Sequence, residues 1–438
     1  MEETVFRRFL RYLTPSVLSM IGLSCYILAD TFFISNKVGT LGLAALNFAI
    51  PMYSAMNGTG LMLGVGGATK FAILRAKGER KEGDRAFSQI LMFGVLVSVA
   101  FLLIGRLAAD PLAVFLGANV EAEALTAMYI RVLLTFSPCF ILNNILVAFV
   151  RNDEGPRLAM TAMLLGTATN VVLDYVFIYP MDMGMFGAAL ATGISPTVSL
   201  FVFLLGHCAS KRSTFHLRRS RFAPRLVGEC CSLGVSAFIG EVSSCIVILV
   251  FNLIIFNLTG NQGVAAYGII ANTAYVVISI FNGVTQGSQP LLSEYYACAH
   301  YRKQTQVMRY GLIAAVVLGG AVWLGVTVFA PQIAEIFNSE HDAALTAVAV
   351  PGLRIYFVGF WLTGVNLMLA AAFAAVEQTK ASFIVSISRG LIGIVALVLI
   401  FSRIWGMTGV WLSFPATEAV TLLTALILYR RSREGAKA

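Results

Sequence analysis

Two aspartates lie where a charged side chain is costly. Asp30 and Asp174 fall inside long apolar runs, and Asp174 follows Asn170 by four residues. Residues four apart share one face of a helix, so this amide and this carboxylate would lie side by side. An ionisable side chain inside an apolar span is expensive and marks a functional site by default. These residues are therefore the first candidates for chemistry.

Oxygen-rich side chains of this kind suit a cation. Thr192, in the next apolar run, adds a hydroxyl oxygen to the set. Two carboxylates in a low-dielectric site cannot both stay ionised and unpaired, so they share a proton, bind a cation or meet a basic side chain. We predict a cation site made of Asp30, Asn170, Asp174 and Thr192. The alternative, in which these groups only hydrogen-bond neighbouring helices, stays open.

The coupling ion is not decided by this composition. A proton needs only the two carboxylates, whereas Na⁺ also needs neutral oxygen ligands, and both kinds are present. The sequence therefore predicts H⁺ or Na⁺ at the site and does not choose between them.

A second group of polar residues in apolar runs is a candidate substrate or proton site. Glu241 either meets a cationic compound or carries a proton, unless it is a solvated residue near a helix start. Arg389 either neutralises a buried acid or anchors its run. The neutral members line a central cleft or serve helix packing, and they are Asn143, Asn144, Gln286, Gln289 and Asn366.

The runs that carry these residues are long enough to cross a membrane. The chain has 438 residues, of which 58% are hydrophobic and only 12% charged, against roughly 25% charged in soluble domains. A helix of about 20 apolar residues spans the hydrocarbon core. We therefore predict an all-α membrane protein with twelve transmembrane helices. The runs lie near residues 8–34, 42–72, 88–108, 124–150, 158–179, 187–208, 228–256, 262–292, 309–329, 345–374, 381–402 and 409–429.

The positive charge is a signal of topology. The net charge is +9, and most of the 31 Lys and Arg residues fall in the segments that share one side of the membrane with the two termini. Because basic residues accumulate on the cytoplasmic side, both termini are expected there. The expected location is the cytoplasmic (inner) membrane, with multiple passes, and no nucleic-acid partner is expected.

The two halves of the chain repeat one pattern. GLAAL at Gly42 returns as GVAAY at Gly263, and GMFGAALAT at Gly184 returns as GMTGVWLSF at Gly406. Each repeat holds six spans, so both enter the membrane in the same orientation. We predict domains at 1–215 and 216–438, two six-helix lobes related by a pseudo-two-fold axis along the membrane normal, with substrate bound near the midplane between them.

The repeats disagree at the four cation-site positions. Their counterparts in the second half are apolar or lack a side chain, and they are Val250, Gly393, Leu397 and Phe414. The sequence therefore predicts one cation site, in the N-terminal lobe only.

Several stretches resemble the multidrug and toxic compound extrusion (MATE) family, in particular its bacterial multidrug exporters. FVRNDEGPRLAM from Phe149, NVVLDYVFIYPMDMGMFGAALAT from Asn170 and GSQPLLSEYYACAHYRK from Gly287 carry the resemblance. The last departs from the family at Tyr295–Cys298, where members usually have Asn-Tyr-Gly-Ala.

The resemblance implies twelve helices in two bundles around a V-shaped cavity. It implies a cation site formed by an Asp on the first helix, an Asn and an Asp one turn apart on the fifth, and a Thr on the sixth. Asp30, Asn170, Asp174 and Thr192 match these places, and Glu241 loosely matches a Glu on the seventh helix of some relatives.

From these features we expect a secondary active antiporter that exports amphipathic, often cationic compounds in exchange for H⁺ or Na⁺. The alternative is a flippase of lipid-linked precursors, which would need several basic residues in its cleft. We expect no enzyme and no cofactor, because no metal or nucleophile cluster and no GxxxxGK[ST] loop is present. The expected partners are small amphipathic compounds, the coupling cation and the lipid bilayer, and the protein is expected to be a monomer.

Overall fold

The computed structural model describes residues 4–118, 120–153, 155–209, 216–337 and 343–435, and over these ranges every regular element is a helix. Each of the twelve predicted runs coincides with helical segments, which confirms the all-α fold class. The helices of the first half are α1 (Val5–Lys37), α2 (Thr40–Ala76), α3 (Arg80–Leu107), α4 (Ala109–Phe115), α5 (Val120–Thr135), α6 (Ser137–Asn152), α7 (Pro156–Ile178) and α8 (Gly184–Ala209).

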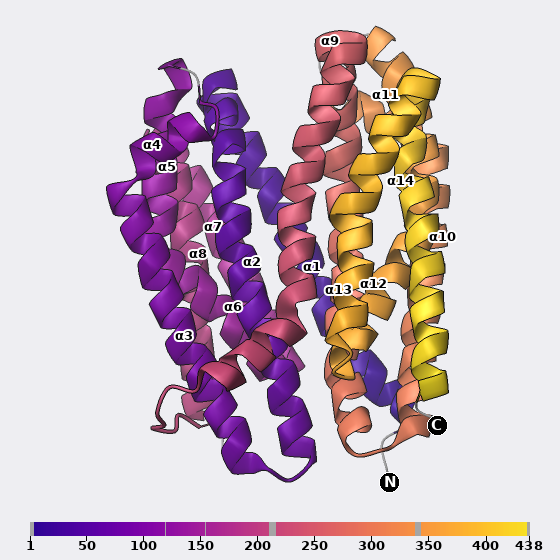
Figure 1. The fold of residues 1–438 in the computed structure, drawn as a ribbon. Helices are drawn as coiled ribbons and strands as arrows, with labels where there is room; N and C mark the ends of the chain where they lie inside the picture. The colour runs from indigo at the N-terminus through magenta and orange to yellow at the C-terminus, as the bar shows by residue number, and fades with distance from the viewer. Residues whose placement is uncertain (1–3, 119, 154, 210–215, 338–342, 436–438) are drawn as a thin grey trace. The chain divides into compact units, whose positions relative to one another are not determined.

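The helices of the second half are shown from pink to yellow in Figure 1. They are α9 (Pro224–Ala297), α10 (Tyr301–Phe337), α11 (Ala343–Tyr356), the 3₁₀ turn η1 (Phe357–Gly359), α12 (Phe360–Ala375), α13 (Thr379–Ile387), the π-helical turn η2 (Ser388–Ile392) and α14 (Gly393–Gly435).

Glycines separate predicted runs that follow each other without a loop. Gly260 in α9 and Gly406 in α14 have φ of +65° and +55°, a conformation that glycine adopts at little cost. Among the described residues, nine helices are long and apolar enough to cross a membrane, or ten if α5 and α6, bent by 49°, form one span. That count takes Thr379–Arg431 as one helix and does not include α2. The bent pair, α2 and the division of Thr379–Arg431 at Gly406 together account for the difference between nine and twelve.

The described chain forms two compact units. One, here called unit A, contains Leu10–Val242 and Ser293–His300, and the other, unit B, contains Ser243–Leu292 and the described residues from Tyr301 onward, with the start of α1. Unit A therefore includes the first part of α9, beyond the repeat boundary predicted after residue 215. The repeats concern sequence similarity and the units concern packing, so the predicted domain limits stay a prediction.

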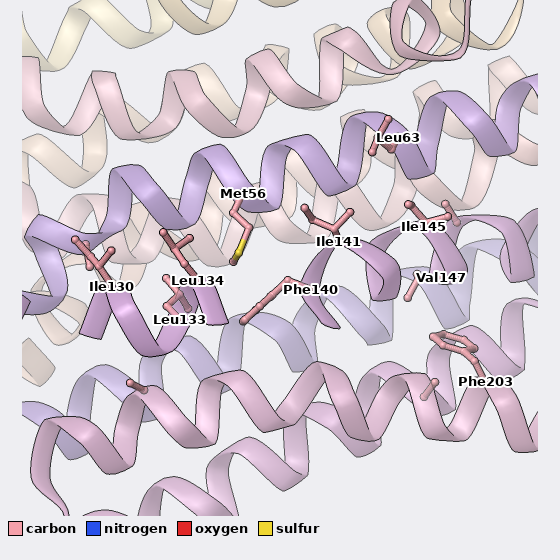
Figure 2. Close-up of a cluster of buried hydrophobic side chains, with 14 of the residues drawn as sticks. Met56, Leu63, Ile130, Leu133, Leu134, Phe140, Ile141, Ile145, Val147 and Phe203 are labelled. Carbon is pink, nitrogen blue, oxygen red and sulfur yellow. The ribbon is translucent and has the colours of Figure 1, made fainter. Parts of the chain in front are cut away.

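The core of unit A is formed where α2 meets its neighbours. Figure 2 shows Met56 and Leu63 of α2 in one buried cluster with Ile130 of α5 and Ile141 of α6. α2 also packs against α3, and α7 packs against α8. Because lipid tails are as apolar as these side chains, close van der Waals packing holds membrane helices together.

Glycines bring the backbones of α2 and α6 into contact. A Cβ at Gly64 would lie 2.5 Å from the carbonyl oxygen of Asn144 and 3.2 Å from Cα of Ile145. Gly60, one turn earlier, faces the Asn144 side chain, and a Cβ at Gly60 would lie 2.8 Å from Nδ2 of Asn144. The spacing of small residues along α2 therefore serves close helix packing.

Substituting Gly64→Val should separate α2 from α6. We expect a loss of about 1–3 kcal/mol, as for overpacking in other cores, seen as a fall of several degrees in the unfolding temperature of the purified protein. Gly325→Ala in α10 is the control, because no atom lies within 4 Å of its Cβ position. An equal, small effect of both substitutions would contradict the proposed contact.

Candidate functional site

The four predicted cation-site residues are buried in unit A. Asp30 lies on α1, Asn170 and Asp174 on α7, and Thr192 on α8. Their exposed fractions are 7%, 0%, 0% and 6% in that order. Asp30 lies close enough to Asp174 for the two charges to interact. The structure therefore brings together residues from three helices that the sequence had proposed as one site.

Asn170 links α7 to α8. Its Nδ2 donates to Oδ2 of Asp174 (3.0 Å) and its Oδ1 accepts from the backbone N–H of Thr192 (3.2 Å). This orientation of the amide pairs a donor with an acceptor at both ends, whereas the reverse orientation would oppose like groups. The amide thus fixes the position of one Asp174 oxygen relative to α8.

Small residues hold α7 against α8 one helical turn before this amide. Gly166, one turn before Asn170, approaches the backbone of Ser195, whose Oγ donates to the carbonyl of Gly166 (2.8 Å). Ser199 donates in the same way to the carbonyl of Ala162 (2.9 Å). Such interhelical hydrogen bonds between small residues stabilise membrane helix pairs. The side chains of the site therefore rest on a tightly packed pair of helices.

Three oxygen atoms of the site have no hydrogen-bond partner among the described residues. They are Oδ1 of Asp30, Oδ1 of Asp174 and Oγ1 of Thr192, all fully buried. A buried polar atom left unpaired costs about 1–3 kcal/mol, and more when it is charged. The arrangement fits a ligand that such oxygens bind, which is a proton or a hard cation.

No basic side chain neutralises these carboxylates in the described part of the chain. The ion pairs found there involve other acids, and neither Asp30 nor Asp174 takes part in one. Within the same ranges no three His, Cys, Asp or Glu side chains form a metal-binding group. Among the described residues, neither carboxylate is therefore neutralised by a basic side chain.

Tyrosines surround the site and were missed by the sequence reasoning. The hydroxyl of Tyr129 on α5 lies near Thr192 and within electrostatic range of both aspartates. Tyr26 lies one turn before Asp30 on α1, and it hydrogen-bonds Tyr53 of α2. The four-residue spacing from Asp30 could have identified Tyr26. Nothing in the sequence marked Tyr129, because only the packing of α5 on α8 brings it there.

Glu241 belongs to a second polar group in unit A. Its Oε1 accepts a hydrogen bond from Nδ2 of Asn57 (3.0 Å), and Oδ1 of Asn57 accepts one from Nδ2 of Asn144 (2.8 Å). The chain of hydrogen bonds joins α9, α2 and α6. Tyr53 lies within electrostatic range of both Glu241 and Asp30, so the second group is near the first. The neighbouring candidate Asn143 has a buried Oδ1 without a partner.

The remaining candidates lie in unit B. Nε of Arg389, in η2, donates to Oε1 of Glu418 (2.7 Å), and Nδ2 of Asn366 donates to Oε2 of the same carboxylate (2.7 Å). Arg389 therefore neutralises a buried acid, one of its two predicted roles. Gln286 and Gln289 lie on α9, partly and fully buried respectively.

Comparison with known proteins matches the whole chain. The MatE family model matches residues 15–176 and 237–399, one segment in each half. The multidrug export protein MepA of Staphylococcus saprophyticus is 24% identical over 428 residues, covering 98% of this chain and 94% of the relative.

Solved structures show the same fold. One is an outward-facing multidrug resistance MATE family transporter of the MOP superfamily, with a TM-score of 0.92, 25% identity and coverage of 99% of this chain and 97% of the other. Another, a MOP superfamily transporter from Pyrococcus furiosus, has a TM-score of 0.92, 24% identity and coverage of 100% and 97%. With a family model matching most of its length, this chain belongs to the MatE family.

Proposed function

We propose that the protein is a secondary active antiporter that exports amphipathic, often cationic compounds in exchange for H⁺ or Na⁺. The observation that carries the proposal is the pair of buried carboxylates, Asp30 and Asp174, without a basic partner among the described residues. The multidrug export function named for the staphylococcal relative supports the class of substrate.

The coupling cation would bind between three helices. Asp30 would contribute from α1, Asp174 from α7 and Thr192 from α8, through the oxygen atoms that have no hydrogen-bond partner in the described ranges. A cation or proton there removes the repulsion between the two carboxylates and draws α1 towards α7. Coupling requires that this occupancy favours one conformation of the transporter over the other. Movement of α1 relative to α7 and α8 is the change we propose.

The substrate side of the proposal rests on the polar group around Glu241. Its carboxylate is partly buried and paired only with the neutral Asn57 in the described structure. A buried carboxylate without a basic partner attracts an organic cation or a proton. The hydrogen bonds through Asn57 to Asn144 keep the carboxylate in one orientation.

A flippase for lipid-linked precursors is supported less well. It would need unpaired basic side chains within the spans to bind pyrophosphate. Arg389, a basic side chain inside an apolar run, is already paired with Glu418. We place the protein in the cytoplasmic membrane with both termini in the cytoplasm, following the distribution of Lys and Arg. We expect it to be a monomer.

Removing one carboxylate should uncouple transport. Asp174→Asn keeps the size of the side chain and its contact with Asn170 but lowers the charge of the site. We expect ion-driven efflux of a fluorescent organic cation from cells to fall at least about tenfold, the effect of 1.4 kcal/mol or more. Asp110→Asn is the matched control, because that carboxylate is 67% exposed and lies outside the site. Unchanged efflux by Asp174→Asn at normal expression would refute the assigned role.

The driving ion can be found in proteoliposomes. A Na⁺ gradient and a pH gradient are imposed separately, and we expect one of them to drive uptake or efflux that Asp30→Asn abolishes. Thr192→Val separates the two cases: loss of a neutral ligand should weaken Na⁺ coupling, and it should leave proton coupling largely intact. Drive by neither gradient, with folded protein, would count against antiport and favour the flippase.

Neutralising Glu241 should affect cationic compounds selectively. Glu241→Gln can still accept the hydrogen bond from Asn57, so the fold is retained. We expect KM for a cationic compound to rise several-fold, while KM for an uncharged compound of similar size changes less than twofold. Equal changes for both compounds would show that Glu241 does not recognise the positive charge of the substrate.

A further inference from the structure

The described segment before α9 is fastened to the side of α3. The backbone N–H of His216 donates to Oδ1 of Asp84 (3.0 Å), and the backbone N–H of Arg218 donates to Oγ of Ser88 (2.8 Å). Figure 1 shows this segment running beside one end of α3. It is therefore part of the packed structure of unit A.

Gln89 completes this attachment. This side chain is only 1% exposed. Its Nε2 donates to Oγ of Ser220 (2.7 Å) and to the carbonyl of Arg221 (3.0 Å), and its Oε1 accepts from the backbone N–H of Ala223 (2.8 Å). Phe222 also stacks on Phe93 of α3, with ring centroids 6.4 Å apart. The backbone on both sides of Arg219 is thus held in place.

A cavity of about 440 Å³ lies between the segment and α3. Its lining residues are Ser88, Gln89, Met92, Leu217, Arg218, Arg219 and Ser220. Pockets that bind small ligands have volumes of about 300–1,000 Å³. The cavity therefore has room for a polar headgroup.

The two arginines give this cavity a positive charge. Arg218 and Arg219 are exposed, and in the part of the chain that the structure describes neither forms an ion pair. The nearest acid on α3, Asp84, already accepts the backbone N–H of His216 and does not line the cavity. An anionic group would thus meet two unpaired guanidinium groups, which bind phosphate oxygens in bidentate geometry.

One of the residues that line the cavity belongs to an apolar face of α3. Met92 is 42% exposed, and with side chains three, four, seven and eleven positions later it forms one exposed row along the helix. This row consists of Met92, Val95, Leu96, Val99 and Leu103. Since α3 is one of the helices able to cross a membrane, the row faces lipid tails. Leu217, 72% exposed, adds apolar surface beside the arginines.

We propose that this cavity binds the headgroup of an anionic phospholipid. Arg218 and Arg219 hold the phosphate, and an acyl chain lies along the apolar row of α3. The combination of unpaired arginines with a continuous apolar face suits a charged lipid better than a soluble anion. The site lies at the segment that joins the two sequence repeats, on the side where basic residues accumulate and anionic headgroups attract them.

Native mass spectrometry of the purified protein tests the proposal. Phosphatidylglycerol and phosphatidylcholine with identical acyl chains are titrated separately, and we expect tighter binding of phosphatidylglycerol. The double substitution Arg218→Gln and Arg219→Gln should weaken phosphatidylglycerol binding about 30-fold, which equals about 2 kcal/mol at 1.4 kcal/mol per factor of ten. Arg302→Gln with Lys303→Gln, exposed residues of α10, removes the same charge and should change binding less than twofold.

Three results would overturn the proposal. They are equal binding of the two lipids, equal losses in the two double variants, and displacement of phosphatidylglycerol by millimolar inorganic phosphate. The last result would identify a site for free anions. Because the assay measures lipid binding and not transport, its result does not depend on the proposed antiport.

Discussion

The low dielectric of a helical membrane protein restricts what two neighbouring carboxylates can do. In water Asp30 and Asp174 would both be ionised at little cost, but inside a bundle each charge loses its hydration, and the pair also repels. The described structure supplies a neutral amide, Asn170, and no basic side chain for them. A proton or cation bound between them would relieve this cost, which is why we propose them as the coupling site.

The helices around these carboxylates are packed too closely to adapt to both states without moving. Gly166 places α7 directly on α8, and Gly64 places α2 directly on α6. Close-packed interiors shift between discrete arrangements and do not deform continuously. In the mechanism we propose, a change of charge at Asp174 would act on a helix pair held together by backbone contacts.

Buried acids in this chain are accommodated in two ways. In unit B, Glu418 is 1% exposed and is satisfied by Arg389 and Asn366. Breaking such a buried pair by removing one partner typically costs about 3–5 kcal/mol, because the other charge is left uncompensated. Glu418 is therefore suited to holding α12, η2 and α14 together, whereas Asp30 and Asp174 are suited to exchanging a ligand.

The pattern of apolar and polar residues was sufficient to predict the helices and to name the residues of the candidate site. Runs of about 20 apolar residues predicted the helices, and the four-residue spacing of Asn170 and Asp174 placed them on one helix face, because these are local consequences of helical geometry. Only the tertiary structure decided which groups meet. The hydrogen bond from Asn57 to Glu241 joins residues 184 positions apart, Tyr129 reaches Thr192 through helix packing, and Arg389 has Glu418 as its partner. Such contacts depend on how helices cross and which way each side chain points, and neither property is encoded in local periodicity.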